Sequence, residues 1–167
     1  MTPQNQILLI PKIERGYVID HIPAGIGIRV MALIGGRAEL EDAVVTLGLN
    51  YKSTRMGRKD MIKLQADALP PRLLQMLALG SPGITIKRIA NFEVIEKVVI
   101  QIPELFDNLA RCINPNCITN AEPHVPTRFK RLESGPRHFK CAPCERVCAL
   151  DELAGHFKAV ARPSCQL

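Results

Sequence analysis

Four cysteines in the last third of the sequence form two closely spaced pairs. Four residues separate Cys112 from Cys117, two separate Cys141 from Cys144, and 23 residues lie between the pairs. Zinc in structural sites prefers thiolate sulfur, and two short pairs can supply the four corners of a tetrahedron. Asparagine and proline inside the first pair favour the turn that such a pair needs. The spacing therefore predicts one Zn2+ ion per chain, held by these four cysteines.

Other sulfur and imidazole groups lie near these pairs. Cys148 and Cys165 follow the second pair, and His124 and His138 lie between the two pairs. The symmetry of the two pairs favours the ligand set given above, so we expect Cys148 and Cys165 to be spare thiols. Four thiolates leave no open coordination position, which indicates a structural rather than a catalytic ion. No nucleophile with a convincing base is evident, so the sequence predicts a protein that is not an enzyme.

The uneven distribution of cysteine indicates two domains. All six cysteines of the 167 residues lie after residue 111, where proline, asparagine and basic residues also become more frequent. We expect a first domain over residues 1–103 and a zinc-binding domain over residues 104–167, with a C-terminal tail from about residue 150. A domain as small as the second, with so few apolar residues, needs bound metal to fold.

The first domain shows alternating strand and helix patterns. After a short apolar run at residues 7–10, these patterns predict strand, helix, strand, strand, helix and strand. This order is that of an α+β, ferredoxin-like (βαββαβ) domain, with two helices on one face of an antiparallel sheet. The second domain is expected to be small and β-rich. The predicted strands cover residues 17–22, 43–49, 59–64 and 84–102, the helices cover 25–34 and 70–80, and a loop covers 50–58.

The net charge of +6 is spread along the chain without a long basic run. A protein that binds duplex DNA shows a denser basic face, so we expect no nucleic-acid partner. Basic residues between the cysteine pairs nevertheless leave an alternative open, a zinc-ribbon protein that binds nucleic acid. The sequence has no apolar run long enough to cross a bilayer, so no membrane association is expected. The N-terminus lacks a basic leader before an apolar stretch, which predicts a cytoplasmic protein with reduced thiols.

An ordered set of short motifs resembles the regulatory chain of aspartate carbamoyltransferase. The match runs from about residue 5 to about residue 148, and the combination of motifs is far more specific than any one of them. The motifs are GYVIDHIPA at 16–24, GLN at 48–50, MGRKD at 56–60, NFEV at 91–94, CINPNCITNAEP at 112–123 and KCAPC at 140–144.

This resemblance implies a non-catalytic regulatory subunit that serves pyrimidine biosynthesis. In the family, CTP and UTP inhibit and ATP activates, all at one site on the N-terminal allosteric domain. The resemblance also implies that two regulatory chains pair through their N-terminal sheets. The zinc domain would bind the catalytic chain and so link two catalytic trimers.

The resemblance further implies roles for individual residues. Asp20 is expected at the ribose, His21 near the phosphates, Lys97 on the triphosphate, and Lys63 within reach of the nucleotide from a neighbouring strand. Two positions depart from the family pattern, because Lys87 replaces a polar amide and Gln6 stands where a lysine can occur. The residues expected to frame the base are Ile13, Val18, Ile89, Phe92 and Val94.

Phosphate binding by this chain would depend on the charge of side chains. The sequence contains neither a Walker-type loop nor a GxGxxG loop whose backbone could hold phosphates. Lysines on strands can serve instead, because strand side chains alternate between faces and can reach an anion from the side opposite the core.

Overall fold

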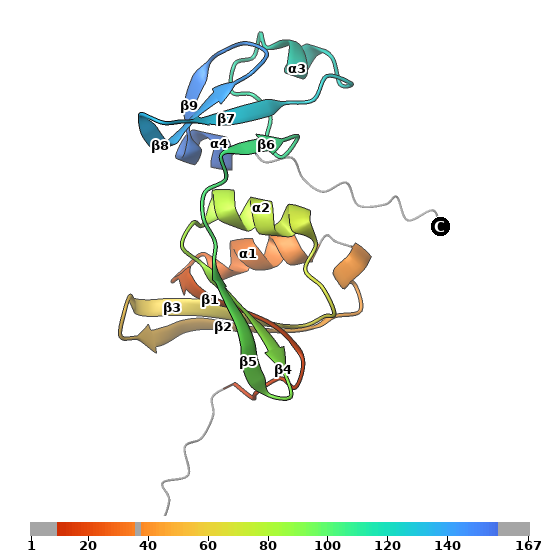
Figure 1. Cartoon of the computed structure of the whole chain (residues 1–167), viewed down its shortest axis with the longest axis vertical. Coiled ribbons are helices and arrows are strands. Elements are labelled where there is room, and N and C mark those ends of the chain that lie inside the picture. Colours follow the sequence, from red (N-terminus) through yellow and green to blue (C-terminus); the bar gives the residue numbers. More distant parts are fainter. Residues whose placement is uncertain (1–9, 36–37, 157–167) are drawn as a thin grey trace, which may run out of the picture.

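Two antiparallel sheets follow one another along the chain (Figure 1). The computed structural model describes residues 10–35 and 38–156. The first sheet has the order β2-β3-β1-β4-β5. Its strands are β1 (Gly16–Pro23), β2 (Val44–Ser53), β3 (Gly57–Gln65), β4 (Thr85–Ala90) and β5 (Glu93–Val99), and helices α1 (Gly27–Ile34) and α2 (Pro71–Gly80) and a 3-10 turn (Ala38–Leu40) accompany them.

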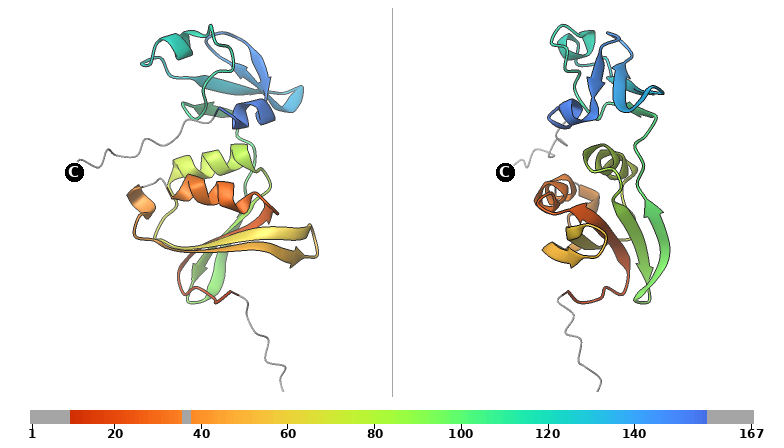
Figure 2. Two further views of the ribbon diagram at one scale, coloured as in Figure 1. Left: turned by 180° about the vertical axis from the view of Figure 1, so that it is seen from behind. Right: turned by 90° about the vertical axis from the view of Figure 1, so that its left-hand side faces the viewer.

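The ferredoxin-like order is confirmed for the first sheet, and both helices cover the same face (Figure 2). Ile19, Ile62 and Ile86 point from neighbouring strands into the core beneath the helices. Side chains alternate along a strand, so the residues next to these three point to the open face. The fold therefore exposes one face of the sheet while the other is packed.

Two sequence-based expectations for this domain were wrong. The segment 84–102 is not one extended strand but a hairpin, because Asn91 and Phe92 turn the chain with φ values of 51° and 64°. Neither turn residue is glycine, so the usual sequence signal for positive φ was missing. The loop expected at 50–58 is shorter, since β2 continues to Ser53 and β3 begins at Gly57. The apolar run at residues 7–10 falls almost entirely outside the described residues.

The second sheet forms around three phenylalanines. It has the order β6-β7-β8-β9, and Phe106, Phe129 and Phe139 are buried in its core. The ring centroids of Phe129 and Phe139 each lie 5.1 Å from that of Phe106, an ordinary packing distance for aromatic pairs. The elements are β6 (Leu105–Asp107), α3 (Ile118–Ala121), β7 (Arg128–Leu132), β8 (Gly135–Cys141), β9 (Val147–Ala149) and α4 (Leu150–Ala154).

Part of the expected C-terminal tail belongs to this second core. Leu150 and Leu153 of α4 are buried there, although the sequence suggested no role for residues after about 150.

None of the helices in the described parts of the chain is both long and apolar enough to span a bilayer.

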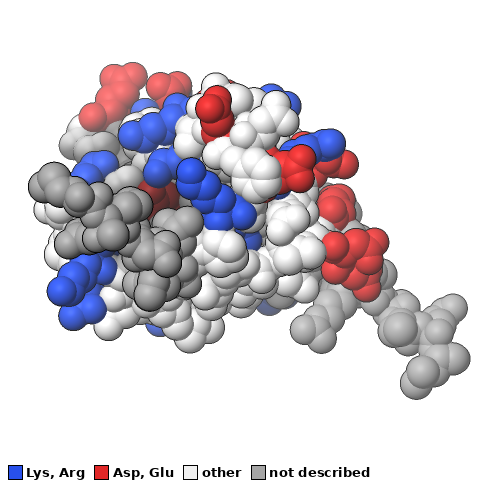
Figure 3. All heavy atoms as spheres, turned by 90° about the horizontal axis from the view of Figure 1, so that it is seen from below, with Lys and Arg blue, Asp and Glu red and all other residues white. Residues whose placement is uncertain are grey.

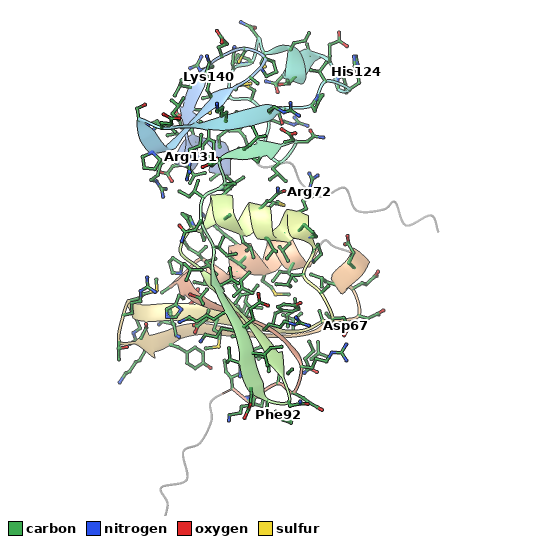
Figure 4. All side chains as sticks on the ribbon, viewed as in Figure 1. Asp67, Arg72, Phe92, His124, Arg131 and Lys140 are labelled. Carbon is green, nitrogen blue, oxygen red and sulfur yellow. The ribbon has the colours of Figure 1, made fainter. Side chains whose placement is uncertain are left out.

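Helix α2 contacts both cores. Leu73 and Leu77, one helical turn apart, pack into the core of the first sheet. Met76 and Leu79 pack instead with the core of the second sheet. Arg72, which points from α2 toward the second sheet in Figure 4, donates a hydrogen bond to the Asn108 carbonyl at 3.0 Å. The two sheets are therefore joined through a helix as well as through the connecting chain.

Candidate metal centre and anion-binding face

The structure brings the four paired cysteines together. Their Sγ atoms all lie within 4.8 Å of one another, with 3.6 Å between Cys112 and Cys144 and 3.9 Å between Cys117 and Cys141. A tetrahedral zinc ion with Zn–S bonds of about 2.3 Å requires sulfurs about 3.8 Å apart. The two shorter separations match this value, so the second domain contains a four-cysteine site suited to one Zn2+ ion.

Electrostatics show what such a cation contributes. Burial raises the pKa of Cys112 to about 11 and also raises the pKa of Cys141, so these thiols stay protonated in the metal-free protein at neutral pH. Burial opposes ionisation of Cys144 too, but hydrogen bonds, the first from the Arg146 backbone, outweigh it and lower that pKa to about 7. A divalent cation would stabilise all four thiolates, so metal binding and folding are coupled.

Hydrogen bonds to the backbone position the first cysteine pair. The Asn120 side chain donates to the carbonyls of Cys112 and Asn114 at 2.9 and 2.8 Å, which closes the loop between the pair. Cys117 occupies the position just before the short helix α3, and its Sγ lies 3.2 Å from the Thr119 hydroxyl. The turn is therefore held by side chains that the sequence places just after the pair.

The other candidate ligands lie outside the cluster. Cys148 is buried, but its Sγ donates a hydrogen bond to the Phe139 carbonyl at 3.5 Å and belongs to the hydrophobic core. His138 and His124 are both exposed, and the Nδ1 atom of His124, which is labelled near α3 in Figure 4, lies 3.6 Å from a Glu122 carboxylate oxygen. Among the described residues, the only group with metal-ligand geometry is the four-cysteine cluster. Cys165 lies outside the described residues.

A row of lysines crosses the open face of the first sheet. Strand register places Lys63 of β3 opposite Val18 of β1, Val18 opposite Lys87 of β4, and Lys87 opposite Lys97 of β5. Directly opposed side chains share one face of a sheet. The structure thus brings Lys63 and Lys97, the two cations expected from the sequence, into one row with Lys87 between Val18 and Lys97.

Asp20 lies beside this row as its counter-ion. The Nζ atoms of Lys59 and Lys87 donate to its two carboxylate oxygens at 2.6 and 2.7 Å. Burial disfavours ionisation of this carboxyl group, but the two lysines outweigh it and hold the pKa of Asp20 well below its ordinary value. Sequence reasoning missed Lys59, which belongs to the MGRKD motif. The only available signal was that motif, since the contact joins residues 39 positions apart.

His21 occupies an unusual backbone position. It has φ of 60° at an irregularity of β1, and its backbone N–H donates to the Asp20 carboxylate at 2.8 Å. Burial lowers the pKa of the imidazole, which is therefore neutral at physiological pH. Its Nδ1 atom is buried and has no hydrogen-bond partner within the described residues. This atom lies 3.7 Å from an Asp20 carboxylate oxygen, so His21 and Asp20 form one polar group beside the lysine row.

The apolar residues expected around the base partly come together. Ile13, Val18 and Ile89 form a small buried cluster against Met61, separate from the core beneath the helices. Phe92 and Val94 lie at the β4–β5 turn, and both are 54% exposed. The Phe92 N–H donates to the Glu14 carbonyl at 3.0 Å, which fixes the turn beside the segment that carries Ile13. Apolar and cationic groups thus adjoin on this face.

Charge on this side of the molecule is unevenly distributed. In the view from below, several Lys and Arg side chains lie near the centre and left, whereas acidic side chains lie mainly along the upper and right edges (Figure 3). A small anion would meet local positive charge between uncharged surfaces there.

Several basic residues of the second domain are each paired with an acidic residue. Arg128 contacts Asp107 at 2.9 Å and Arg137 contacts Asp151 at 2.7 Å. Lys140 is paired with Glu145 in the same way. Such pairing leaves little unbalanced charge for a phosphate backbone, which argues against the nucleic-acid alternative.

Comparison with known proteins gives a consistent result over both domains. Residues 8–101 match the allosteric domain of the aspartate carbamoyltransferase regulatory chain, and residues 104–154 match its metal-binding domain. A regulatory chain of Pyrococcus horikoshii is 36% identical over 146 residues, which cover 87% of this chain and 95% of the relative. One from Yersinia enterocolitica is 40% identical over 144 residues, 86% and 92% of the two chains. The chain therefore belongs to the family of aspartate carbamoyltransferase regulatory chains, the non-catalytic subunits of that enzyme.

Proposed function

We propose that this chain binds CTP and UTP as inhibitors and ATP as an activator on the open face of its first sheet. The observation that carries the proposal is the row of Lys63, Lys87 and Lys97 next to the apolar cluster of Ile13, Val18 and Ile89. Ammonium groups attract phosphates, and the apolar cluster offers a surface for a base. Asp20 and His21 follow the lysine row along β1, on the side away from Ile89, and suit the ribose and phosphate ends of a nucleotide.

The second domain is proposed to bind the catalytic chain and so attach the regulatory chain to catalytic trimers. Ile118 follows the first cysteine pair and Val147 follows the second, and these apolar side chains are 48% and 47% exposed. Exposed apolar side chains on a rigid, metal-held scaffold suit a protein interface. Two regulatory chains are proposed to pair through their first sheets, whose edge strand β2 exposes Val44 and Leu49. Because the proposed partner is a biosynthetic enzyme, we propose that the chain functions in the cytoplasm.

Helix α2 provides a route between the nucleotide and the partner. Nucleotides would bias an equilibrium between two states of the assembly by binding one state more tightly than the other. Couplings of this kind amount to about 1–3 kcal/mol, so small rearrangements suffice. Because Met76 and Leu79 belong to the core of the second domain, a shift of the first sheet and its helices displaces the metal-binding domain too.

Co-expression with a catalytic chain tests the proposed function directly. We expect the two polypeptides to co-purify as a complex whose mass exceeds that of a catalytic trimer. Carbamoyltransferase activity of this complex should fall with CTP or UTP and rise with ATP. The proposal would be contradicted if none of the three nucleotides changed the activity of the complex. It would also be contradicted if the chain bound oligonucleotides with an affinity that falls steeply with salt.

Replacing Lys97 by Ala should weaken the nucleotide response. Lys97 lies on the exposed strand β5 and has no partner among the described residues, so its loss removes charge without disturbing the core. A charge-assisted contact of this kind corresponds to roughly tenfold in affinity. Isothermal titration with CTP and ATP measures the effect, and the mass of the complex should stay unchanged. Lys52→Ala on β2 serves as the control, and equal affinities in the two variants would refute the role of Lys97.

A further inference from the structure

The lysine that departs from the family pattern occupies a central place in the open face. Lys87 stands directly opposite Lys97 on β5 and, on its other side, opposite Val18 on β1. Like charges placed directly opposite each other destabilise a sheet unless another group compensates them. A compensating group for this pair must come either from the protein or from a ligand.

Asp20 supplies only part of that compensation. Its carboxylate is shared between Lys87 and Lys59, so one negative charge serves two positive ones. With Lys63 and Lys97 included, the face carries four ammonium groups against one carboxylate. Lys63 donates only to neutral backbone carbonyls, including that of Pro11, and Lys97 has no acidic partner among the described residues. The face therefore carries excess positive charge around Lys87, the lysine that lies directly opposite Lys97.

The side chains of Asp20 and Lys87 differ in how far they are exposed to solvent, which suggests different roles in anion binding. The Asp20 side chain is 4% exposed, whereas that of Lys87 is 26% exposed. An anion from solvent therefore meets the ammonium group first, with the carboxylate behind it. An ammonium group has three donors, so Lys87 can keep one on Asp20 and turn the others toward a ligand. Asp20 thereby holds Lys87 in place and reduces the entropy lost when an anion binds.

We propose that Lys87, positioned by Asp20, contacts the phosphates of the nucleotide and sets how strongly the site prefers a triphosphate to a monophosphate of the same base. This inference rests on the proposed nucleotide-binding function. Lys87 is then a specificity-determining residue, and Asp20 is a positioning residue. A triphosphate would be preferred to a monophosphate because its longer phosphate chain reaches the ammonium group of Lys87, which is held between Val18 and Lys97. The single phosphate of a monophosphate would not reach that group, so it would lose this charge-assisted contact.

Titration calorimetry on the zinc-loaded full chain tests the proposal with CTP and CMP, and with ATP and AMP. We expect the wild-type chain to bind each triphosphate more tightly, and Lys87→Gln to reduce that ratio about tenfold. Lys87→Arg keeps the charge and should restore most of the preference. Arg88→Gln removes one positive charge from the next residue, which points to the other face of β4, and should leave the ratio unchanged.

The outcomes separate this inference from the function on which it rests. A wild-type chain that binds none of the four nucleotides overturns both. If nucleotides bind but Lys87→Gln keeps the wild-type ratio, only the role of Lys87 is overturned. A reduction of equal size in Arg88→Gln also overturns it, because the effect would then reflect net charge rather than contact. Thermal unfolding of each variant shows whether the fold is intact.

Discussion

A chain in which Cys112 is replaced by Ser is expected to lose its zinc and the folded state of its second domain. The site then retains three thiols around a weaker oxygen ligand, and burial raises the pKa of Cys141, which opposes ionisation of that thiol. Zinc binding contributes on the order of 10 kcal/mol to the folding of small zinc domains, more than a domain of this size gains from its core. Elemental analysis should find well under one zinc per chain, and hydrogen exchange should show residues 104–154 unprotected.

The same variant should release the catalytic partner. If the metal-binding domain forms the contact, trimers separate in active form and no longer respond to CTP or ATP. Cys148→Ala is the matched control, because it also removes a buried thiol of the same core but leaves the four-sulfur cluster intact. This control should keep its zinc and its partner. A Cys112→Ser chain that remains attached and regulated would exclude the metal-binding domain as the site of attachment.

The metal centre was visible in the sequence because its geometry is almost entirely local. Each cysteine pair is closed by its own turn, so spacing alone indicates the ligands, and only the docking of two turns depends on the fold. The order of strands and helices was predictable for the same reason, since apolar periodicity and the glycines and prolines near helix ends act over short distances. The hairpin at Asn91 and Phe92 was missed, because Asn91 suits a positive φ but phenylalanine stands at the second turn position, where glycine is the usual signal.

The anion-binding face could only be predicted in part. Lys63 and Lys97 are ordinary strand lysines, and nothing in the sequence distinguishes them from solvated surface charges. Register alone places them in one row, and register depends on pairing between strands far apart in the chain. The charge pairing of Asp20 with Lys59 and Lys87 is equally non-local, as is the division of α2 between two cores. Helical periodicity predicted a helix over residues 70–80 but gave no reason to expect a second core on the other side of α2.

Asp60 is the residue of the first domain whose replacement should have the largest effect on stability. Its carboxylate is fully buried and accepts hydrogen bonds from the backbone N–H groups of Gly25, Gly27 and Asn50 at 2.8 to 2.9 Å. These bonds tie β3 to the start of α1 and to the bend in β2. The fit leaves no spare room, because a Cβ atom at Gly27 would lie 2.9 Å from the Asp60 side chain.

Asp60→Ala should lower the free energy of unfolding by about 2–3 kcal/mol, since the buried N–H of Gly27 would lose its acceptor, whereas the N–H groups of the exposed Gly25 and Asn50 can turn to water. Asp60→Asn keeps one acceptor oxygen and should fall between that variant and the wild type. Asp42→Ala, at an exposed aspartate, should change the stability by less than about 0.5 kcal/mol. Urea unfolding followed by circular dichroism measures all three. Lys59 precedes Asp60 in the sequence and contacts Asp20, so nucleotide binding should weaken in parallel with stability. If the Asp60→Ala chain proved as stable as the Asp42→Ala chain, water would replace the carboxylate without cost and the prediction would be wrong.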